Sequence, residues 1–126
     1  MVMLWAGMIF YLSSISPSKA LRLLPRIPHL DKWLHFTAYC MGGYWFGRAL
    51  AVTFAWKKRW VILVGVVILS LYGVSDEYHQ TFVEGRTGGD PGDVVADILG
   101  SLTGLVLSSF PVIYARKSDF TPTPTA

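Results

Sequence analysis

Residues 61–74 read VILVGVVILSLYGV, and residues 94–114 read VVADILGSLTGLVLSSFPVIY. The first stretch carries no charged side chain, and the second carries only Asp97. A surface helix of a soluble protein places polar residues at every turn, so that one of its faces stays hydrated. These stretches do not, and crossing the hydrocarbon core of a bilayer takes about 20 mostly apolar residues. Both stretches therefore predict membrane-spanning helices.

Two further apolar runs, Val2 to Ile15 and Trp33 to Trp56, precede these stretches. The composition agrees with a membrane location, because 52% of the 126 residues are hydrophobic and only 15% are charged, against about 25% charged residues in soluble proteins. The sequence predicts an all-α fold over residues 1–115, an integral membrane bundle of four transmembrane helices. Residues 116–126 contain Thr-Pro repeats and are expected to form a disordered tail.

The first run is short for a membrane span and also resembles the apolar part of a signal peptide, with a cleavage site at Ser18-Lys19-Ala20. A signal peptide normally begins with a positively charged segment, which is not seen ahead of this run. We therefore favour an uncleaved helix. Residues 16–32 mix leucines with basic residues between prolines. They suit either a segment at the lipid–water boundary or a solvated basic loop.

The positive residues do not determine which way the helices cross the membrane. The positive-inside rule compares the lysines and arginines near the ends of the spans. With four spans, each side receives the same number, Lys57, Lys58, Arg59, Arg116 and Lys117 on one side and Lys19, Arg22, Arg26, Lys32 and Arg86 on the other. No basic patch is interleaved with aromatic residues, so the net charge of +3 does not predict nucleic-acid binding.

Polar residues gather where three of the predicted helices meet one face of the membrane. In an up-and-down bundle, this face holds the start of the second helix, the end of the third and the start of the fourth. The residues lie about one turn apart on their helices, in the pairs His35 and Tyr39, Glu77 and Gln80, and Asp93 and Asp97. Lys32 and Arg86 lie beside them in the sequence. Asp31 is the expected N-cap of the second helix, and Asp76 is interpreted as an ordinary boundary carboxylate.

Asp97 is expected to lie about one turn inside the membrane. A charge there costs about 2.5–3.5 kcal/mol, so such residues usually pair, face a cavity or serve a function. Arg86 and His35 are the candidate partners of this carboxylate. Gly100 and Gly104 share its side of the helix and predict close packing against another helix.

A metal site is the less favoured interpretation of these residues. By residue type, an ion could bind His79, Glu77, Asp90 and Asp93. However, no HExxH or CxxC spacing is present. We therefore expect no metal ion and no cofactor.

Several spaced motifs resemble those of the VanZ-like membrane proteins, namely Asp31-Lys32-x-x-His35-x-x-x-Tyr39, Ser75-Asp76-Glu77-x-His79-Gln80-x-Phe82, Gly85-Arg86 and Asp93-x-x-x-Asp97-x-x-Gly100-x-x-x-Gly104. The resemblance runs from about Ser13 to Gly104. It implies a four-helix protein of the bacterial cytoplasmic membrane with both termini in the cytoplasm. The founding member of that family is associated with low-level teicoplanin resistance. The motif residues carried over are Lys32, His35, Tyr39, Glu77, Gln80, Arg86, Asp93 and Asp97.

Three functions remain open. A cell-envelope protein would bind a lipid head group or a peptidoglycan-related ligand, with Arg86 and Lys32 holding an anionic group. An intramembrane enzyme would act on an envelope lipid, with His35 or Glu77 as general base. A structural or partner-binding module would use the polar residues only to lock its helices together. The expected partners are membrane lipids, an anionic lipid or cell-wall precursor, and a second copy of the chain, with no nucleic acid.

Overall fold

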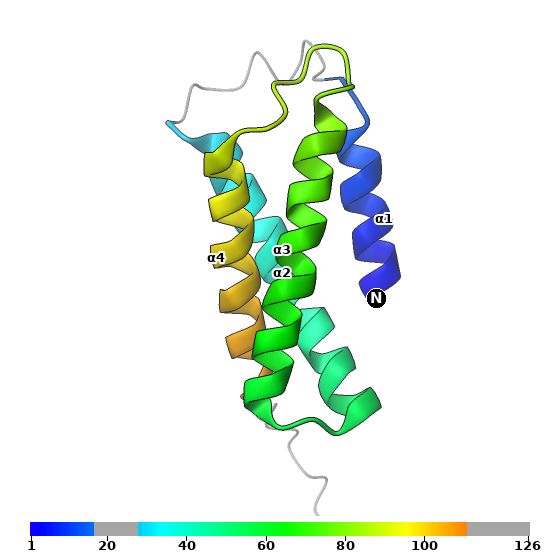
Figure 1. Cartoon of the computed structure of the whole chain (residues 1–126), viewed down its shortest axis with the longest axis vertical. Helices are drawn as coiled ribbons and strands as arrows, with labels where there is room; N and C mark the ends of the chain where they lie inside the picture. The colour runs from blue at the N-terminus through cyan, green and yellow to red at the C-terminus, as the bar shows by residue number, and fades with distance from the viewer. Residues whose placement is uncertain (17–27, 111–126) are drawn as a thin grey trace, which may run out of the picture.

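A computed structural model describes residues 1–16 and 28–110 (Figure 1). These residues form four α-helices, so the predicted all-α class is confirmed. The helices are α1 (Val2–Ser13), α2 (Leu30–Phe54), α3 (Lys58–Gln80) and α4 (Pro91–Ser108). The suggested signal-peptide cleavage site, most of the basic segment after α1 and the predicted tail lie outside the described residues.

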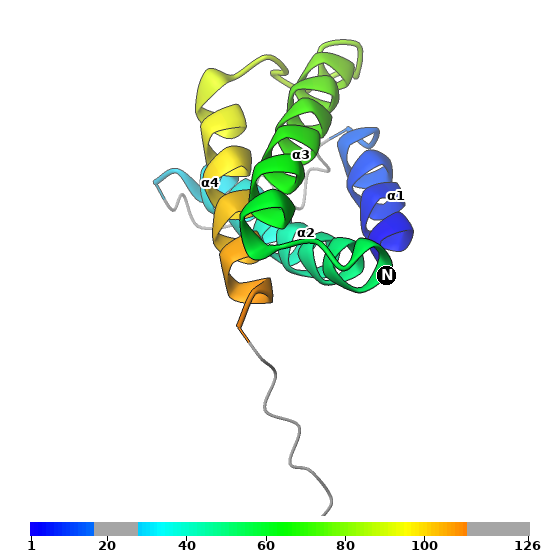
Figure 2. The same cartoon turned by 60° about the horizontal axis from the view of Figure 1, so that its bottom comes forward.

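Successive helices run in opposite directions along the bundle (Figure 1). The end of α1, the start of α2, the end of α3 and the start of α4 therefore meet at one end, beside the loop of residues 81–90. The opposite end holds residues 55–57 and the end of α4. α4 packs against α2 and α3, whereas α1 lies beside α3 on the side away from α4 (Figure 2).

Two helix starts differ from the sequence prediction. Asp31 is not the N-cap of α2, because the helix begins at Leu30 and the preceding His29 has a left-handed backbone with φ 57°. α4 begins at Pro91, whose ring suits the first turn of a helix, and not at Asp93. The side chain of Asp90 caps this helix by accepting a hydrogen bond from the backbone nitrogen of Gly92 at 2.7 Å.

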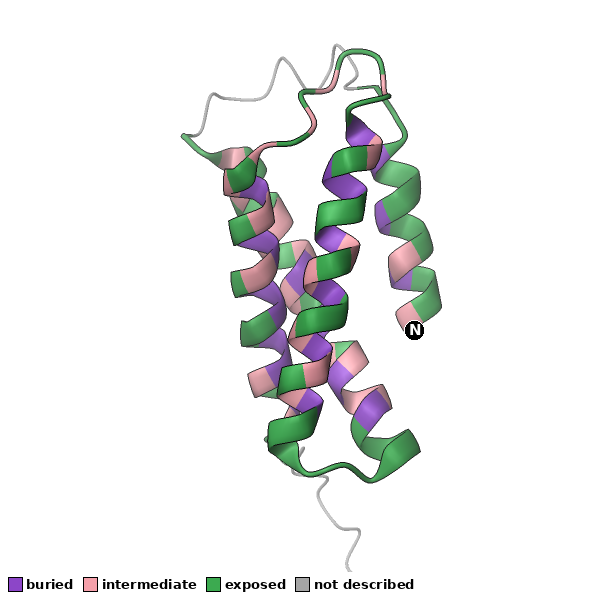
Figure 3. Cartoon of the chain, viewed as in Figure 1, coloured by how far each residue is buried: buried purple, intermediate pink, exposed green. Residues whose placement is uncertain are grey.

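Besides a small apolar core, the bundle buries several polar residues, and it exposes many large apolar ones. Figure 3 shows the buried positions as stripes facing the neighbouring helices, with exposed positions on the outer surface. The exposed residues of α3 and α4 include the large apolar side chains of Leu63, Val67, Leu71, Val74, Val95, Leu99 and Leu107. The buried set includes Asp76, Glu77, Gln80, Asp93, Asp97, Ser101 and Ser108. An apolar outer surface of this extent is characteristic of contact with a membrane.

Two of the helices are long and apolar enough to cross a membrane. α3 and α4 contain windows with mean hydropathy 1.7 and 1.2 respectively. α1 is apolar but has only 12 residues, which correspond to about 18 Å at a rise of about 1.5 Å per residue. α2 is long enough, with 25 residues, but it does not meet the combined criterion of length, mean hydropathy and few charged residues.

Glycines allow α2 and α4 to approach each other closely. A Cβ atom built on Gly100 would collide with the carbonyl oxygen of Phe36, and one on Gly104 would collide with that of Cys40. On the facing helix, a Cβ atom on Gly43 would lie 2.5 Å from the carbonyl oxygen of Ser101. Small residues therefore bring the two backbones into direct contact, as they do between membrane helices generally.

We expect Gly104→Ala to destabilise the protein by about 1–3 kcal/mol, because the added methyl group would force α2 away from α4. Gly7→Ala is the matched control, since a Cβ atom on Gly7 would meet nothing within 4 Å. Both substitutions raise helix propensity equally. Thermal unfolding in detergent measures the difference, and equal stability of the two variants would contradict the close α2–α4 packing.

Candidate functional site

Lys32 binds three carboxylates where α2 meets α4. Its Nζ donates hydrogen bonds to Asp90 at 2.7 Å, to Asp93 at 3.0 Å and to Asp31 at 3.1 Å. The pKa of Asp90 is lowered, mainly because the ammonium group of Lys32 donates a hydrogen bond to its carboxylate. The ammonium group thus connects the first turn of α2 to the cap and first turn of α4.

His35 is the partner of the buried Asp97. The His35 Nδ1 atom lies 2.9 Å from Asp97 Oδ1, and Asp97 is fully buried. When Nδ1 carries the proton and donates to this carboxylate, Nε2 keeps its lone pair. The Nε2 atom lies on the side of the ring toward Glu77, 3.9 Å from Oε1, which is too far for a hydrogen bond.

Glu77 anchors the loop between α3 and α4. Its Oε2 atom accepts hydrogen bonds from the backbone nitrogens of Gly89 at 3.0 Å and Asp90 at 3.1 Å. Its Oε1 atom accepts one from Gln80 Nε2 at 3.0 Å. The residue is 3% exposed, so these donors replace the water that a free carboxylate would bind.

Arg86 contacts the end of α1 and does not bind Asp97. Its Nε atom donates to the carbonyl oxygen of Ile15 at 3.0 Å, and its Nη2 atom donates to that of Leu12. Its Nη1 atom donates to Gln80 Oε1 at 3.1 Å. Carbonyl groups at a helix C-terminus lack partners within the helix and carry partial negative charge. Arg86 therefore fastens α1 to the end of α3.

Four buried polar atoms have no hydrogen-bond partner within the described residues: Tyr39 Oη, Asp76 Oδ1, Asp97 Oδ2 and Ser101 Oγ. Asp76, interpreted from the sequence as a boundary carboxylate, is in fact 5% exposed. Its other oxygen accepts a hydrogen bond from Gln80 Nε2 at 3.0 Å. The i, i+4 spacing of Asp76 and Gln80 was the signal in the sequence that could have identified this pair.

These contacts define a polar cluster at one end of the bundle. One network of hydrogen bonds and close polar contacts connects its members, and through Arg86 it reaches α1, so that it joins all four helices. The members are Asp31, Lys32, His35, Asp76, Glu77, Gln80, Arg86, Asp90, Asp93 and Asp97. All the residues predicted as ligand-binding except Tyr39 belong to it. Tyr39 lies deeper, with its ring packed edge-on against Trp5 at 5.4 Å between centroids.

Nearly the whole chain matches one known protein family. The family model described as VanZ/LLP1 matches residues 1–113. The chain belongs to the VanZ/LLP1 family. No curated protein and no solved structure matches it significantly. Family membership and the apolar helices α3 and α4 together support a membrane protein.

Beside the polar cluster, this VanZ/LLP1 protein has an apolar groove between α3 and α4. The groove encloses about 470 Å³ and is lined by Val74, Glu77, Tyr78, Thr81, Gly89, Pro91, Val94 and Val95. Glu77 is thus a member of the polar cluster that also borders an apolar surface.

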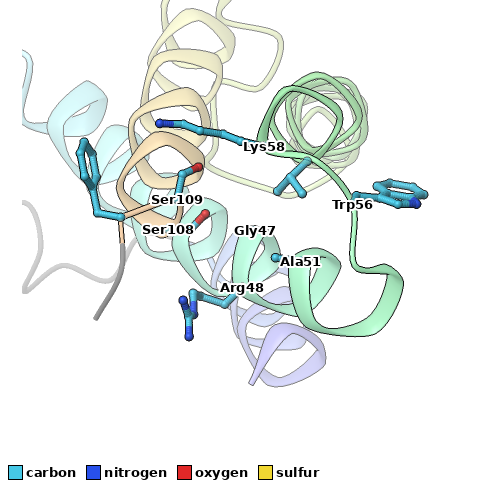
Figure 4. A pocket seen from close by; sticks show the side chains of 9 residues that line it. Gly47, Arg48, Ala51, Trp56, Lys58, Ser108 and Ser109 are labelled. Carbon is cyan, nitrogen blue, oxygen red and sulfur yellow. The ribbon is translucent and has the colours of Figure 1, made fainter. Parts of the chain in front are cut away.

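A second hollow, of about 290 Å³, lies at the opposite end of the bundle. Arg48 and Lys58 lie on either side of Ser108 in this hollow (Figure 4). Trp56 also lines it. Cations and tryptophan together are typical of the boundary between lipid and water.

His79 takes no part in the polar cluster, although it was a candidate metal ligand in the sequence. Its Nε2 atom lies 3.0 Å from Ser14 Oγ, and its ring stacks on Phe10 with the centroids 4.8 Å apart. His79 therefore packs against α1, whereas His35 lies beside Glu77.

We expect Arg86→Ala to loosen α1, because the carbonyl groups of Leu12 and Ile15 would lose their charged donor. A loss of about 1–3 kcal/mol is expected. Hydrogen–deuterium exchange of residues 2–13 measures this effect, and it should rise more than exchange in α4. Arg48→Ala, at the opposite end of the bundle, is the control. Unchanged protection of α1 in Arg86→Ala would contradict this role.

Proposed function

We propose that the chain crosses the bacterial cytoplasmic membrane four times, with both termini in the cytoplasm and the polar cluster at the outer face. The 25 residues of α2 would cover about 37 Å, enough for a bilayer core of about 30 Å. Its Arg48 can extend its charged head toward the boundary. The shorter α1 can be accommodated by local thinning of the bilayer.

The residues at the opposite end of the bundle support a membrane boundary there. Lys57, Lys58 and Arg59 follow one another between Trp56 and Trp60, and all five are exposed. Arg59 lies over the ring of Trp60, 5.6 Å from its centroid. Basic residues are enriched on the cytoplasmic side of membranes, and tryptophan at both boundaries.

We infer that the polar cluster binds the head group of an envelope lipid, with the groove between α3 and α4 receiving part of its hydrocarbon chain. The observation that carries this inference is the position of Glu77, which belongs to the cluster and also borders the groove with Val74, Val94 and Val95. Ligand sites typically combine apolar walls with a few polar groups that orient the ligand.

The charges of the cluster favour one class of head group. Lys32 already donates to three carboxylates, and Arg86 donates to carbonyl and amide oxygens. The cluster therefore has more free acceptors than free donors. Head groups rich in hydroxyl, amide or ammonium donors match this balance better than a simple anionic phosphate. The sugars and peptides of cell-wall precursors have this chemistry, which also suits the association of the founding family member with teicoplanin resistance.

The pairing of His35 with Asp97 favours an intramembrane enzyme as the second candidate. A carboxylate on Nδ1 orients the imidazole and leaves Nε2 available to accept a proton. Glu77 Oε1 lies 3.9 Å from that atom. No GxSxG motif accompanies the pair in the sequence, so the reaction would use water or a substrate group as nucleophile.

We expect Val94→Trp to fill the groove and reduce binding of a polyprenyl-linked cell-wall precursor at least tenfold. Native mass spectrometry of the full chain, reconstituted with that lipid, measures the bound fraction. Val67→Trp is the matched control, since Val67 is exposed on α3 and does not line the groove.

This experiment, repeated with two further variants, separates the candidate functions. Equal retention of the lipid by both variants would contradict binding in the groove. Turnover of the lipid by the wild-type protein that disappears in His35→Asn would favour the enzyme. If Glu77→Gln loses lipid binding but keeps its thermal stability, the polar cluster is more than a lock between helices.

The proposed orientation makes residue 87 accessible from outside the cell. We expect Thr87→Cys, in the exposed loop beside the polar cluster, to react with a membrane-impermeant maleimide in intact cells. Lys57→Cys should react only after permeabilisation. Both substitutions are made in a Cys40→Ser background, because Cys40 is the single native cysteine. The reverse pattern of labelling would overturn the orientation.

A further inference from the structure

Three side chains from three helices bring potential metal ligands together. His35 from α2, Glu77 from α3 and Asp93 from α4 each offer one ligand atom, and these atoms lie within 4.8 Å of one another. The side chains of all three are mostly buried, with exposed fractions of 18%, 4% and 11% respectively. The group is therefore built into the bundle and is not a chance gathering of surface carboxylates.

The His35 ring has the orientation of a metal-binding histidine. Histidine ligands almost always donate their other ring N–H to a carboxylate or carbonyl group, which fixes the tautomer and raises the basicity of the free nitrogen. Here Nδ1 pairs with the fully buried Asp97 at 2.9 Å. The Nε2 atom makes no hydrogen bond to any part of the chain that the structure describes, and it faces Glu77.

The separation of the two nearest ligand atoms also fits an ion. His35 Nε2 and Glu77 Oε1 are 3.9 Å apart, beyond the range of a direct hydrogen bond. Zn²⁺ binds nitrogen and oxygen ligands at about 2.1 Å, so a single ion can touch two atoms up to about 4.2 Å apart. One ion placed between them would touch both atoms. The ligand atom of Asp93 lies within 4.8 Å of each, so a small movement of its side chain would bring it to the same ion.

The two carboxylates are oriented by donors of their own. Glu77 accepts from the backbone nitrogens of Gly89 and Asp90, and Asp93 accepts from Lys32 Nζ at 3.0 Å. Such supporting contacts around the direct ligands are typical of metal sites.

A neighbouring group of carboxylates provides an internal comparison. Asp31, Asp90 and Asp93 also lie within ligand distance of one another, but Lys32 binds all three and supplies their counter-charge. The buried carboxylates of Glu77 and Asp97 have no lysine or arginine within salt-bridge distance among the described residues. Buried charges need a partner or a metal.

We propose that His35 Nε2, Glu77 Oε1 and the carboxylate of Asp93 bind a divalent transition-metal ion of the Zn²⁺ or Mn²⁺ class. One imidazole with two carboxylates suits these ions, whereas Mg²⁺ and Ca²⁺ prefer oxygen ligands alone. This site differs from the sequence expectation of no metal, which followed from the absence of HExxH and CxxC spacing and considered His79 as a ligand but not His35. It goes beyond the proposed lipid function and does not depend on it.

The test uses the full chain in detergent, stripped with a chelator and equilibrated with Zn²⁺ or Mn²⁺ alone. Elemental analysis after removal of free ion is expected to find about one ion per chain. His35→Gln and Glu77→Gln are expected to weaken binding at least tenfold. Glu84→Gln is the matched control, because it removes one negative charge from the exposed loop at the same end of the bundle and Glu84 lies outside the polar cluster. No ion retained by the wild-type chain, or equal binding by folded His35→Gln, would overturn the proposal.

A second measurement covers the case in which the ligand variants do not fold. X-ray absorption of the Zn²⁺-loaded wild-type chain is expected to show one histidine nitrogen among the ligands. Asp97→Asn keeps an oxygen acceptor for His35 but removes the charge, and it is expected to weaken binding about 10–100-fold. A bound ion without a histidine ligand would overturn the site. Because no lipid is present, failure of lipid binding elsewhere leaves this result unaffected.

Discussion

The contact between His35 and Asp97 is the interaction on which the rest of the bundle depends. A carboxylate buried between the helices of a bundle, with no exposure to water, is stable only with a partner that supplies a hydrogen bond. His35 can reach Asp97 only if α2 and α4 are in backbone contact, and the glycines at 100 and 104 permit that contact. The glycines of α4 and the buried Asp97 one turn before them therefore depend on each other: the glycines bring α2 close, and α2 carries the partner of Asp97.

The same constraint shapes the end of the bundle. Once α2 and α4 are joined, Lys32 lies against the capping Asp90 and connects the first turns of both helices. Glu77 then holds the loop that leads from α3 into α4, and Arg86 from that loop fastens α1. Charged side chains at the same face thus connect α2 to α4 and the end of α1 to the end of α3.

Much of this arrangement could be predicted from the sequence, because it follows from apolar run length and from the alternating direction of helices. The four helices and the gathering of polar residues at one end required no further information. The individual partners could not be predicted. The choice between Arg86 and His35 for Asp97 depends on the path of the 81–90 loop, which carries Arg86 toward α1. The burial of Asp76 likewise depends on how closely its neighbours pack, which side-chain periodicity does not specify.

A network whose only task was to hold helices together would be expected to satisfy its own hydrogen bonds, because each buried polar atom without a partner reduces stability. This network does not. Asp97 Oδ2 and Asp76 Oδ1 lack partners within the described residues, and His35 Nε2 faces a carboxylate at a distance that fits a shared ligand. This unused capacity consists of carboxylate and imidazole acceptors, and one member of the network, Glu77, borders the apolar groove between α3 and α4. Acceptors that the protein leaves free in its interior are available to a cation or to a donor-rich ligand, and this balance favours our proposal of a binding site that also stabilises the fold over a lock alone.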